Sequence, residues 1–188
     1  MNKLKYLFVF IVLLLSTTLA QAQYSFRSID IQSGLSDNYV RSIMKDQQGY
    51  LWIGTLNGLS RYDGFHNRSY TLTQKDGKKN ANIIEIAQDK SSQIWITTYD
   101  HHIFCYNPDK DCMQDNANEI LARLGIKISH HNPKKDTRGR VIIDQDKNLW
   151  YISGYTLYYY IYDENRLYQM KLAELINSVT CREGVAYA

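Results

Sequence analysis

Hydrophobic and polar residues alternate in short runs along most of the chain, a pattern typical of β-strands with one buried face. In the stretch 40–72, a polar turn at 46–49 and the pair Asn57-Gly58 separate runs of aliphatic and aromatic residues. Such turns between alternating runs predict an antiparallel meander of four strands. The sixteen tyrosines of the chain, together with frequent Ile, Val and Thr, also favour strands over helices.

This pattern occurs three times, and the three copies align on a tryptophan. Each copy has an aspartate six residues before the tryptophan and an aromatic residue ten or eleven residues after it. A four-stranded unit that repeats at the interval separating Trp52, Trp95 and Trp150 is typical of β-propeller blades. We therefore predict an all-β fold, a β-propeller segment of about three four-stranded blades. The aligned structural positions are Asp46, Trp52 and Tyr62 in the first copy, Asp89, Trp95 and Tyr106 in the second, and Asp144, Trp150 and Tyr160 in the third.

The predicted blade cores lie near residues 40–72, 82–113 and 140–170. A capped helical insertion is expected near 115–125, and a second helical segment is expected at 169–179. Propellers need about four to eight blades, so three blades make an incomplete ring. We accordingly expect residues 23–188 to be the N-terminal part of a longer propeller.

The N-terminus has the layout of a secretory signal peptide. A short basic start is followed by an uninterrupted apolar run and then by the small-residue triplet at 20–22. We predict that residues 1–22 are a signal peptide cleaved before Gln23. The alternative is a membrane anchor, but the apolar run is short for a bilayer, which needs about 20 apolar residues. The mature chain is then periplasmic or secreted, and no later stretch of its sequence is apolar enough to cross a membrane.

Charge gives little indication of a polyanionic partner. The formal net charge is +3, and removal of Lys3 and Lys5 with the signal peptide leaves +1. A nearly neutral chain has no electrostatic footprint for nucleic acid or anionic lipid. We expect no nucleic-acid binding and no cofactor.

The first copy resembles the two-component regulator propeller repeat. The similarity lies in the lead-in "GLSDNYVRSI", the core "D-x-x-G-x-L-W-I-G-T" and the tail "N-G-L-x-R-Y-D-G", between Gly34 and Gly64. It extends more loosely over residues 24–164, where the second copy lacks both glycines of "IGT" and "NGL". The third copy has Ser153-Gly154 in place of "GT".

Proteins with this repeat are typically hybrid two-component sensors of Bacteroidetes. The resemblance implies an exported sensor propeller that binds oligosaccharides, within a longer protein that carries a membrane span and a histidine kinase. Such a parent would be anchored in the inner membrane, and its partners would be the remainder of the sensor or a second copy. The sequence itself contains no kinase motif, so we expect this chain to be non-enzymatic. A secreted propeller-type glycan-active enzyme and a protein-binding scaffold are the alternatives.

The recurring residues are interpreted as structural. Tryptophans at a fixed place in every unit are expected to fill the space between neighbouring blades. The recurring aspartates are expected to close β-turns by accepting backbone N–H groups. A glycosidase would instead need a pair of carboxylates distinguished from the others, and the sequence offers none.

Candidate ligand contacts are residues that do not repeat. Asn38, Tyr39 and Arg41 lead into the first strand and could bond sugar hydroxyls, although turn capping explains Asn38 equally well. Tyr158 and Tyr160 share one side of a predicted strand. They could form a carbohydrate platform, but packing against a neighbouring sheet is the more frequent role.

The cysteines and histidines offer two further possibilities. Cys105 and Cys112 would face each other if Pro108-Asp109 formed a two-residue hairpin loop, so a disulfide and two free thiols both stay open. The free thiols are slightly preferred. The pairs His101-His102 and His130-His131 are adjacent in sequence, so their side chains point apart in a strand, and we expect no metal site.

Overall fold

The structure is a computed structural model that describes most of the chain after residue 25. The described residues are 3, 5–8, 26–73, 77, 79–114, 117–128, 139–172, 180–182 and 185–187. The predicted cleavage site before Gln23 lies outside them. Among the described residues, no helix is long and apolar enough to cross a membrane.

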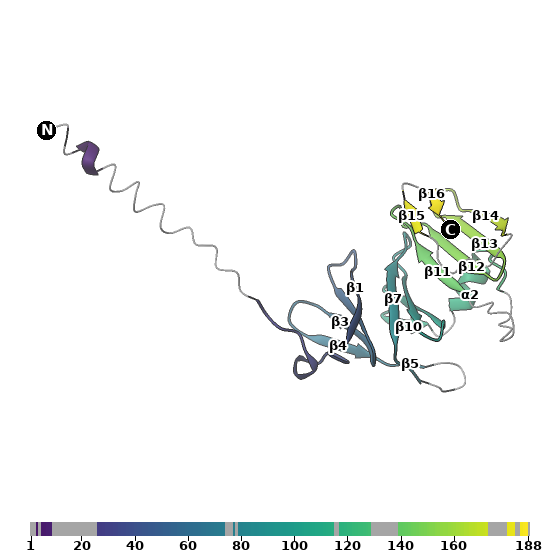
Figure 1. Ribbon diagram of the computed structural model, residues 1–188, viewed down its shortest axis with the longest axis horizontal. Helices are drawn as coiled ribbons and strands as arrows, with labels where there is room; N and C mark the ends of the chain where they lie inside the picture. The colour runs from purple at the N-terminus through teal and green to yellow at the C-terminus, as the bar shows by residue number, and fades with distance from the viewer. Residues whose placement is uncertain are drawn as a thin grey trace.

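Three four-stranded antiparallel sheets lie side by side along the chain (Figure 1). Each sheet is a meander in which the strands follow one another in sequence order. The predicted all-β class is therefore confirmed. The first sheet contains β1 (Val40–Lys45), β2 (Leu51–Thr55), β3 (Gly58–Tyr62) and β4 (Asn67–Tyr70); the second contains β7 (Ile83–Gln88), β8 (Ile94–Thr98), β9 (Ile103–Asn107) and β10 (Cys112–Gln114); the third contains β11 (Arg140–Ile143), β12 (Leu149–Ser153), β13 (Thr156–Ile161) and β14 (Arg166–Lys171).

The remaining elements are short. The helix expected near 115–125 is present as α2 (Ala117–Arg123). The helix expected at 169–179 is wrong over 169–171, because these residues pair with β13 as part of β14, and 173–179 lie outside the described residues. The other elements are the 3-10 helix η2 (Ile31–Ser33), β5 (Leu72–Thr73), β6 (Lys79–Asn80), α2 (Ala117–Arg123), β15 (Thr180–Arg182) and β16 (Val185–Tyr187).

The recurring aspartate closes the turn between the first two strands of each sheet. In the second sheet, Asp89 Oδ1 accepts the backbone N–H of Gln93 at 3.0 Å, and its Oδ2 accepts the Trp95 indole N–H at 2.7 Å. The predicted turn closure is thus confirmed, and the indole bond is an additional role. Equivalent bonds join Asp46 Oδ1 to Tyr50 N (2.9 Å), Asp46 Oδ2 to Trp52 Nε1 (2.7 Å), Asp144 Oδ1 to Asn148 N (2.8 Å) and Asp144 Oδ2 to Trp150 Nε1 (3.0 Å).

Each of the first two tryptophans fills the space between its own sheet and the next. Trp52 packs with Ile94, Ile96 and Tyr106 of the second sheet, and the Trp52 and Tyr106 ring centroids are 4.8 Å apart. Trp95 packs in the same way in a cluster with residues of the third sheet. The cluster around Trp95 includes Val141, Leu149, Tyr151, Tyr158 and Tyr160.

The aromatic position of the repeat is also equivalent in space. Tyr62, Tyr106 and Tyr160 each pair, across the second hairpin, with the residue that precedes the tryptophan. Tyr106 and Tyr160 are buried beneath the preceding sheet, whereas Tyr62 is only partly buried. The sequence alignment of the three copies therefore corresponds to the structural one.

A partly buried arginine links the first two sheets. Arg61 Nη1 donates to the Tyr106 hydroxyl at 2.6 Å and lies 3.3 Å from Asp111 Oδ1. Its guanidinium carbon is 4.6 Å from the centroid of the Tyr50 ring. Asp111 also accepts from Arg68 Nη1 at 2.7 Å. The hydrogen bonds from Tyr106 and Arg68 lower the pKa of Asp111 to about 2.

We expect the Asp–Trp pair to dominate the stability of a sheet junction. Trp95→Ala should lower the free energy of unfolding by about 3–5 kcal/mol, because it removes a fully packed ring. Asp89→Ala should lower it by about 3 kcal/mol or more, because the buried Trp95 indole and the partly buried Tyr162 hydroxyl lose their acceptor. Urea unfolding monitored by circular dichroism measures both values.

The double variant and a surface variant provide the controls. The two losses should sum to more than the loss in the double variant, since the residues share one interaction. Tyr155→Ala removes an exposed ring and should change stability by no more than about 0.5 kcal/mol. Strictly additive losses would contradict the role assigned to the pair.

Asp111 should make stability depend on pH in the acid range. Because its folded pKa lies below the unfolded value of about 3.9, its contribution is complete above that value and is lost as the pH falls toward 2. Urea midpoints of the wild type and Asp111→Asn should therefore differ at pH 6 and converge near pH 2. A difference that is constant over this range would show that the charge of Asp111 contributes nothing.

Candidate ligand-binding site

The lead-ins to the first two sheets, and one loop within each of these sheets, place several non-repeating side chains at the same ends of the strands. Val40 pairs with Thr55, so β1 starts and β2 ends at the same end of the first sheet. Ile83 and Thr98 bring the start of β7 and the end of β8 together in the second sheet. We call residues 37–41, 56–57, 82 and 99–102 the loop edge.

Two of the sequence-predicted residues lie in the lead-in to β1. Asn38 Oδ1 accepts the backbone N–H of Ile31 at 3.0 Å, so its side chain caps a turn, as one of the two interpretations held. The Tyr39 backbone oxygen accepts the Leu56 N–H at 3.0 Å, which ties the lead-in to the β2–β3 loop. The Tyr39 side chain is 63% exposed. Tyr39 therefore presents an open aromatic ring at the loop edge.

Arg41 lies at a β-bulge and reaches the second sheet. The register of β1 against β2 shifts between Val40 and Ser42, which leaves Arg41 outside the regular pairing. Its Nη1 donates to Asn82 Oδ1 at 2.6 Å, and its guanidinium carbon lies 5.9 Å from the centroid of the Tyr99 ring. The sequence placed Arg41 at the site, and the structure adds Asn82 and Tyr99.

The loop that carries Tyr99 is held by its own side chains. Thr98 Oγ1 donates to Asp100 Oδ1 at 2.5 Å, and His102 Nδ1 lies 3.1 Å from Asp100 Oδ2. Burial alone would raise the pKa of Asp100, but the Thr98 hydrogen bond and the neighbouring His102 lower it overall. His101 has a φ of 62° in the left-handed region. This loop leaves the Tyr99 side chain 65% exposed.

Tyr99 could have been found from the repeat. It lies four residues after Trp95, as Leu56 lies four residues after Trp52, and both backbone N–H groups bond the lead-in of their own sheet. A position whose backbone role recurs while its side chain changes is a candidate for ligand contact. The alignment of the three copies contained this signal.

Tyr158 and Tyr160 do not lie at this edge. Both are buried in the cluster between the second and third sheets. The Tyr158 hydroxyl donates to Lys127 O at 3.2 Å, and the Tyr160 hydroxyl donates to Asn165 Oδ1. Packing against the neighbouring sheet leaves no ring face on which a sugar could stack. The carbohydrate platform considered for these two tyrosines is therefore corrected to a packing role.

Cys105 and Cys112 are free thiols. Cys105 pairs with Gln114 across the hairpin, and Cys112 pairs with Asn107, so the two cysteines are not opposite each other. The two-residue loop assumed from the sequence is wrong, because the loop spans four residues. Burial, with the nearby Asp89 carboxylate, raises the pKa of the Cys105 thiol, which makes it unreactive.

The described residues contain no group of three or more His, Cys, Asp or Glu side chains that could hold a metal ion. His101 and His102 belong to the Tyr99 loop. The pair His130-His131 lies outside the described residues.

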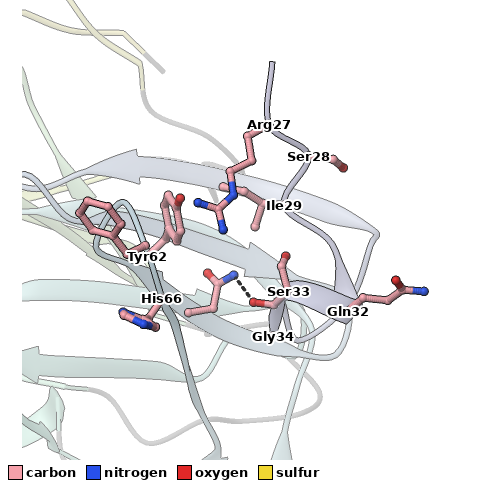
Figure 2. A pocket seen from close by; sticks show the side chains of 10 residues that line it. Arg27, Ser28, Ile29, Gln32, Ser33, Gly34, Tyr62 and His66 are labelled. Carbon is pink, nitrogen blue, oxygen red and sulfur yellow. Dashed lines mark hydrogen bonds between the residues drawn. The ribbon is translucent and has the colours of Figure 1, made fainter. Parts of the chain in front are cut away.

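A shallow pocket lies on the opposite face of the first sheet from Trp52. It is formed between residues 27–34 and the β3–β4 hairpin, and the Asn67 side-chain amide bridges its walls by donating to Ser33 O at 2.8 Å (Figure 2). Tyr62 lines this pocket. In the second sheet, the equivalent Tyr106 is covered by Trp52 of the preceding sheet. The pocket therefore lies on the face of the first sheet that corresponds to a packing face in the second.

Comparison with known proteins supports the repeat. Residues 34–57 match the family described as "Two component regulator propeller". No curated protein matches the sequence.

Solved structures resemble the chain in fold. The extracellular domain of a protein named as the hybrid two-component system BT3049 from B. thetaiotaomicron has a TM-score of 0.52 and 22% identity, over 79% of this chain. The extracellular domain of another such system from the same organism, BT4673, has a TM-score of 0.39 and 16% identity, over 87% of this chain. The chain spans 20% of the length of the first structure and 29% of the second.

The three sheets with their recurring Asp–Trp pairs are thus blades of a β-propeller. More particularly, the first blade carries the two-component regulator propeller repeat, and the chain resembles part of the extracellular domain of Bacteroides hybrid two-component systems.

Proposed function

We propose that this chain is an extracytoplasmic ligand-sensing part of a two-component regulatory system and that it binds oligosaccharides at the loop edge. The observation that supports this proposal most is the gathering of exposed aromatic rings and hydrogen-bonding side chains across two blades. Tyr39 and Tyr99 offer exposed rings, and the side-chain amides of Asn57 and Asn82 lie there hydrogen-bonded to Asp37 and Arg41. Aromatic faces with a few placed polar groups are the usual composition of a ligand site.

The rest of the sensor is part of the same proposal. An exported propeller reports a ligand only if binding favours one of two arrangements of the protein that carries the signal onward. We infer that further propeller blades, a membrane span and a histidine kinase belong to the parent protein. Sequencing of the gene beyond the codon for Ala188 tests this inference, and a genuine stop codon with no kinase gene nearby would count against it.

Binding can be tested by titration calorimetry of the full-length protein against plant and host oligosaccharides. We expect a saccharide to bind, and Tyr99→Ala to weaken that binding about tenfold, because an exposed aromatic contact is worth about 1–2 kcal/mol. Phe65→Ala is the matched control, because Phe65 is an exposed ring in the β3–β4 turn at the opposite edge of the first sheet. The control should bind as the wild type does.

Two other results would redirect the assignment. Equal losses in both variants would place the ligand away from the loop edge. Release of shorter sugars from the same oligosaccharides, followed by chromatography, would support the alternative of a glycan-active enzyme.

A further inference from the structure

The charged side chains of the loop edge differ in their hydrogen-bond and ion-pair partners. Asp37 accepts the Tyr39 backbone N–H at 2.6 Å and the side-chain amide of Asn57. Asp100 accepts the Thr98 hydroxyl and lies beside His102. Both carboxylates are therefore engaged by hydrogen-bond donors close to them.

Arg41 has no such partner of opposite charge. Its contacts with described residues are the neutral Asn82 amide oxygen and the face of the Tyr99 ring. No carboxylate among the described residues lies within ion-pair distance of its guanidinium, and the residue is exposed. The loop edge thus carries one cation whose charge is not neutralised.

Two contacts hold this cation in place. Asn82 Oδ1 accepts from one guanidinium nitrogen of Arg41, and the guanidinium carbon lies over the Tyr99 ring, 5.9 Å from its centroid. A guanidinium held in this way has lost part of its conformational freedom before any ligand arrives. Its remaining N–H groups form a planar fork, which matches the two oxygens of an anion such as a carboxylate.

We propose that the oligosaccharide bound at the loop edge carries an anionic group, and that Arg41 binds this group. A uronate carboxylate and a sulfate ester both supply the required oxygens. The exposed rings of the loop edge would pack against the sugar while Arg41 selects acidic over neutral chains. This inference rests on the proposed function, because it names the class of saccharide for the same site.

The test compares acidic saccharides with neutral forms of the same skeleton. The full-length protein is titrated with tetrasaccharides of galacturonate, alginate and unsulfated chondroitin, each beside its carboxyl-reduced form, and with sulfated chondroitin. We expect at least one acidic form to bind tenfold or more tightly than its neutral counterpart, with an affinity that falls as salt is added. Binding of the sulfated chain alone would identify the anion as a sulfate.

Variants of Arg41 locate the selection. Arg41→Gln should abolish the preference for the acidic form, and Arg41→Lys should retain part of it, since the charge stays but the fork is lost. Lys45→Gln is the matched control, because it removes an exposed cation from the other end of the same strand and should leave the preference unchanged. Thermal unfolding verifies that each variant is folded.

The possible failures are distinguishable. If neutral saccharides bind as tightly as acidic ones, or if Arg41→Gln weakens both forms equally, the assignment of an anionic ligand is wrong while oligosaccharide binding stands. If no saccharide of either kind binds, the proposed function itself is wrong. If an acidic saccharide binds with the same preference in Arg41→Gln, the anion is held elsewhere.

Discussion

Each sheet depends on a carboxylate that serves two groups at once. The oxygens of Asp89 accept a backbone N–H of the β7–β8 turn and the indole N–H of Trp95. The turn sets the register of the hairpin, and the indole sets the spacing to the next sheet. Because one rigid group joins the two, the hairpin and the inter-sheet packing cannot shift independently. The same bonds in the first and third sheets explain why the chain repeats this arrangement as a unit.

The junctions between sheets differ around this shared centre. At the first junction, Arg61 of the first sheet donates to Tyr106 of the second. At the second junction, the Tyr162 hydroxyl donates to Asp89 at 2.6 Å. Gly54 allows the first two sheets to approach, since a Cβ at this position would come within 2.5 Å of an Ile83 methyl group. The repeat therefore fixes where neighbouring sheets touch, and local residues adjust how closely they do so.

The sequence predicted what recurs and failed where geometry is set by a single loop. The strands, the turn-closing aspartates and the packing tryptophans could be predicted because the same physical need appears three times. The register of Cys105 could not be predicted, because it depends on the length of one hairpin loop. The strand at 169–171 could not be predicted either, because it depends on pairing with β13. Helical propensity at 169–171 lost to the hydrogen bonds of β13, which is the usual outcome of such conflicts.

The candidate site was half predictable for the same reason. Arg41 was identified as a polar residue that does not repeat, but its partners Asn82 and Tyr99 come from the next blade, 41 residues or more along the chain. A contact across two blades requires the packed arrangement, which no local pattern contains.

Packing residues recur in each copy because they face a neighbouring sheet. Loop-edge residues vary between copies because their side chains face solvent. At the loop edge the backbone is fixed by repeated hydrogen bonds, from Leu56 N to Tyr39 O and from Tyr99 N to Asn82 O. The Leu56 and Tyr99 side chains on that backbone are exposed and not packed in a core, so the residue at this equivalent position differs between the two sheets. A rigid frame that holds variable, exposed side chains is the arrangement from which binding surfaces are built.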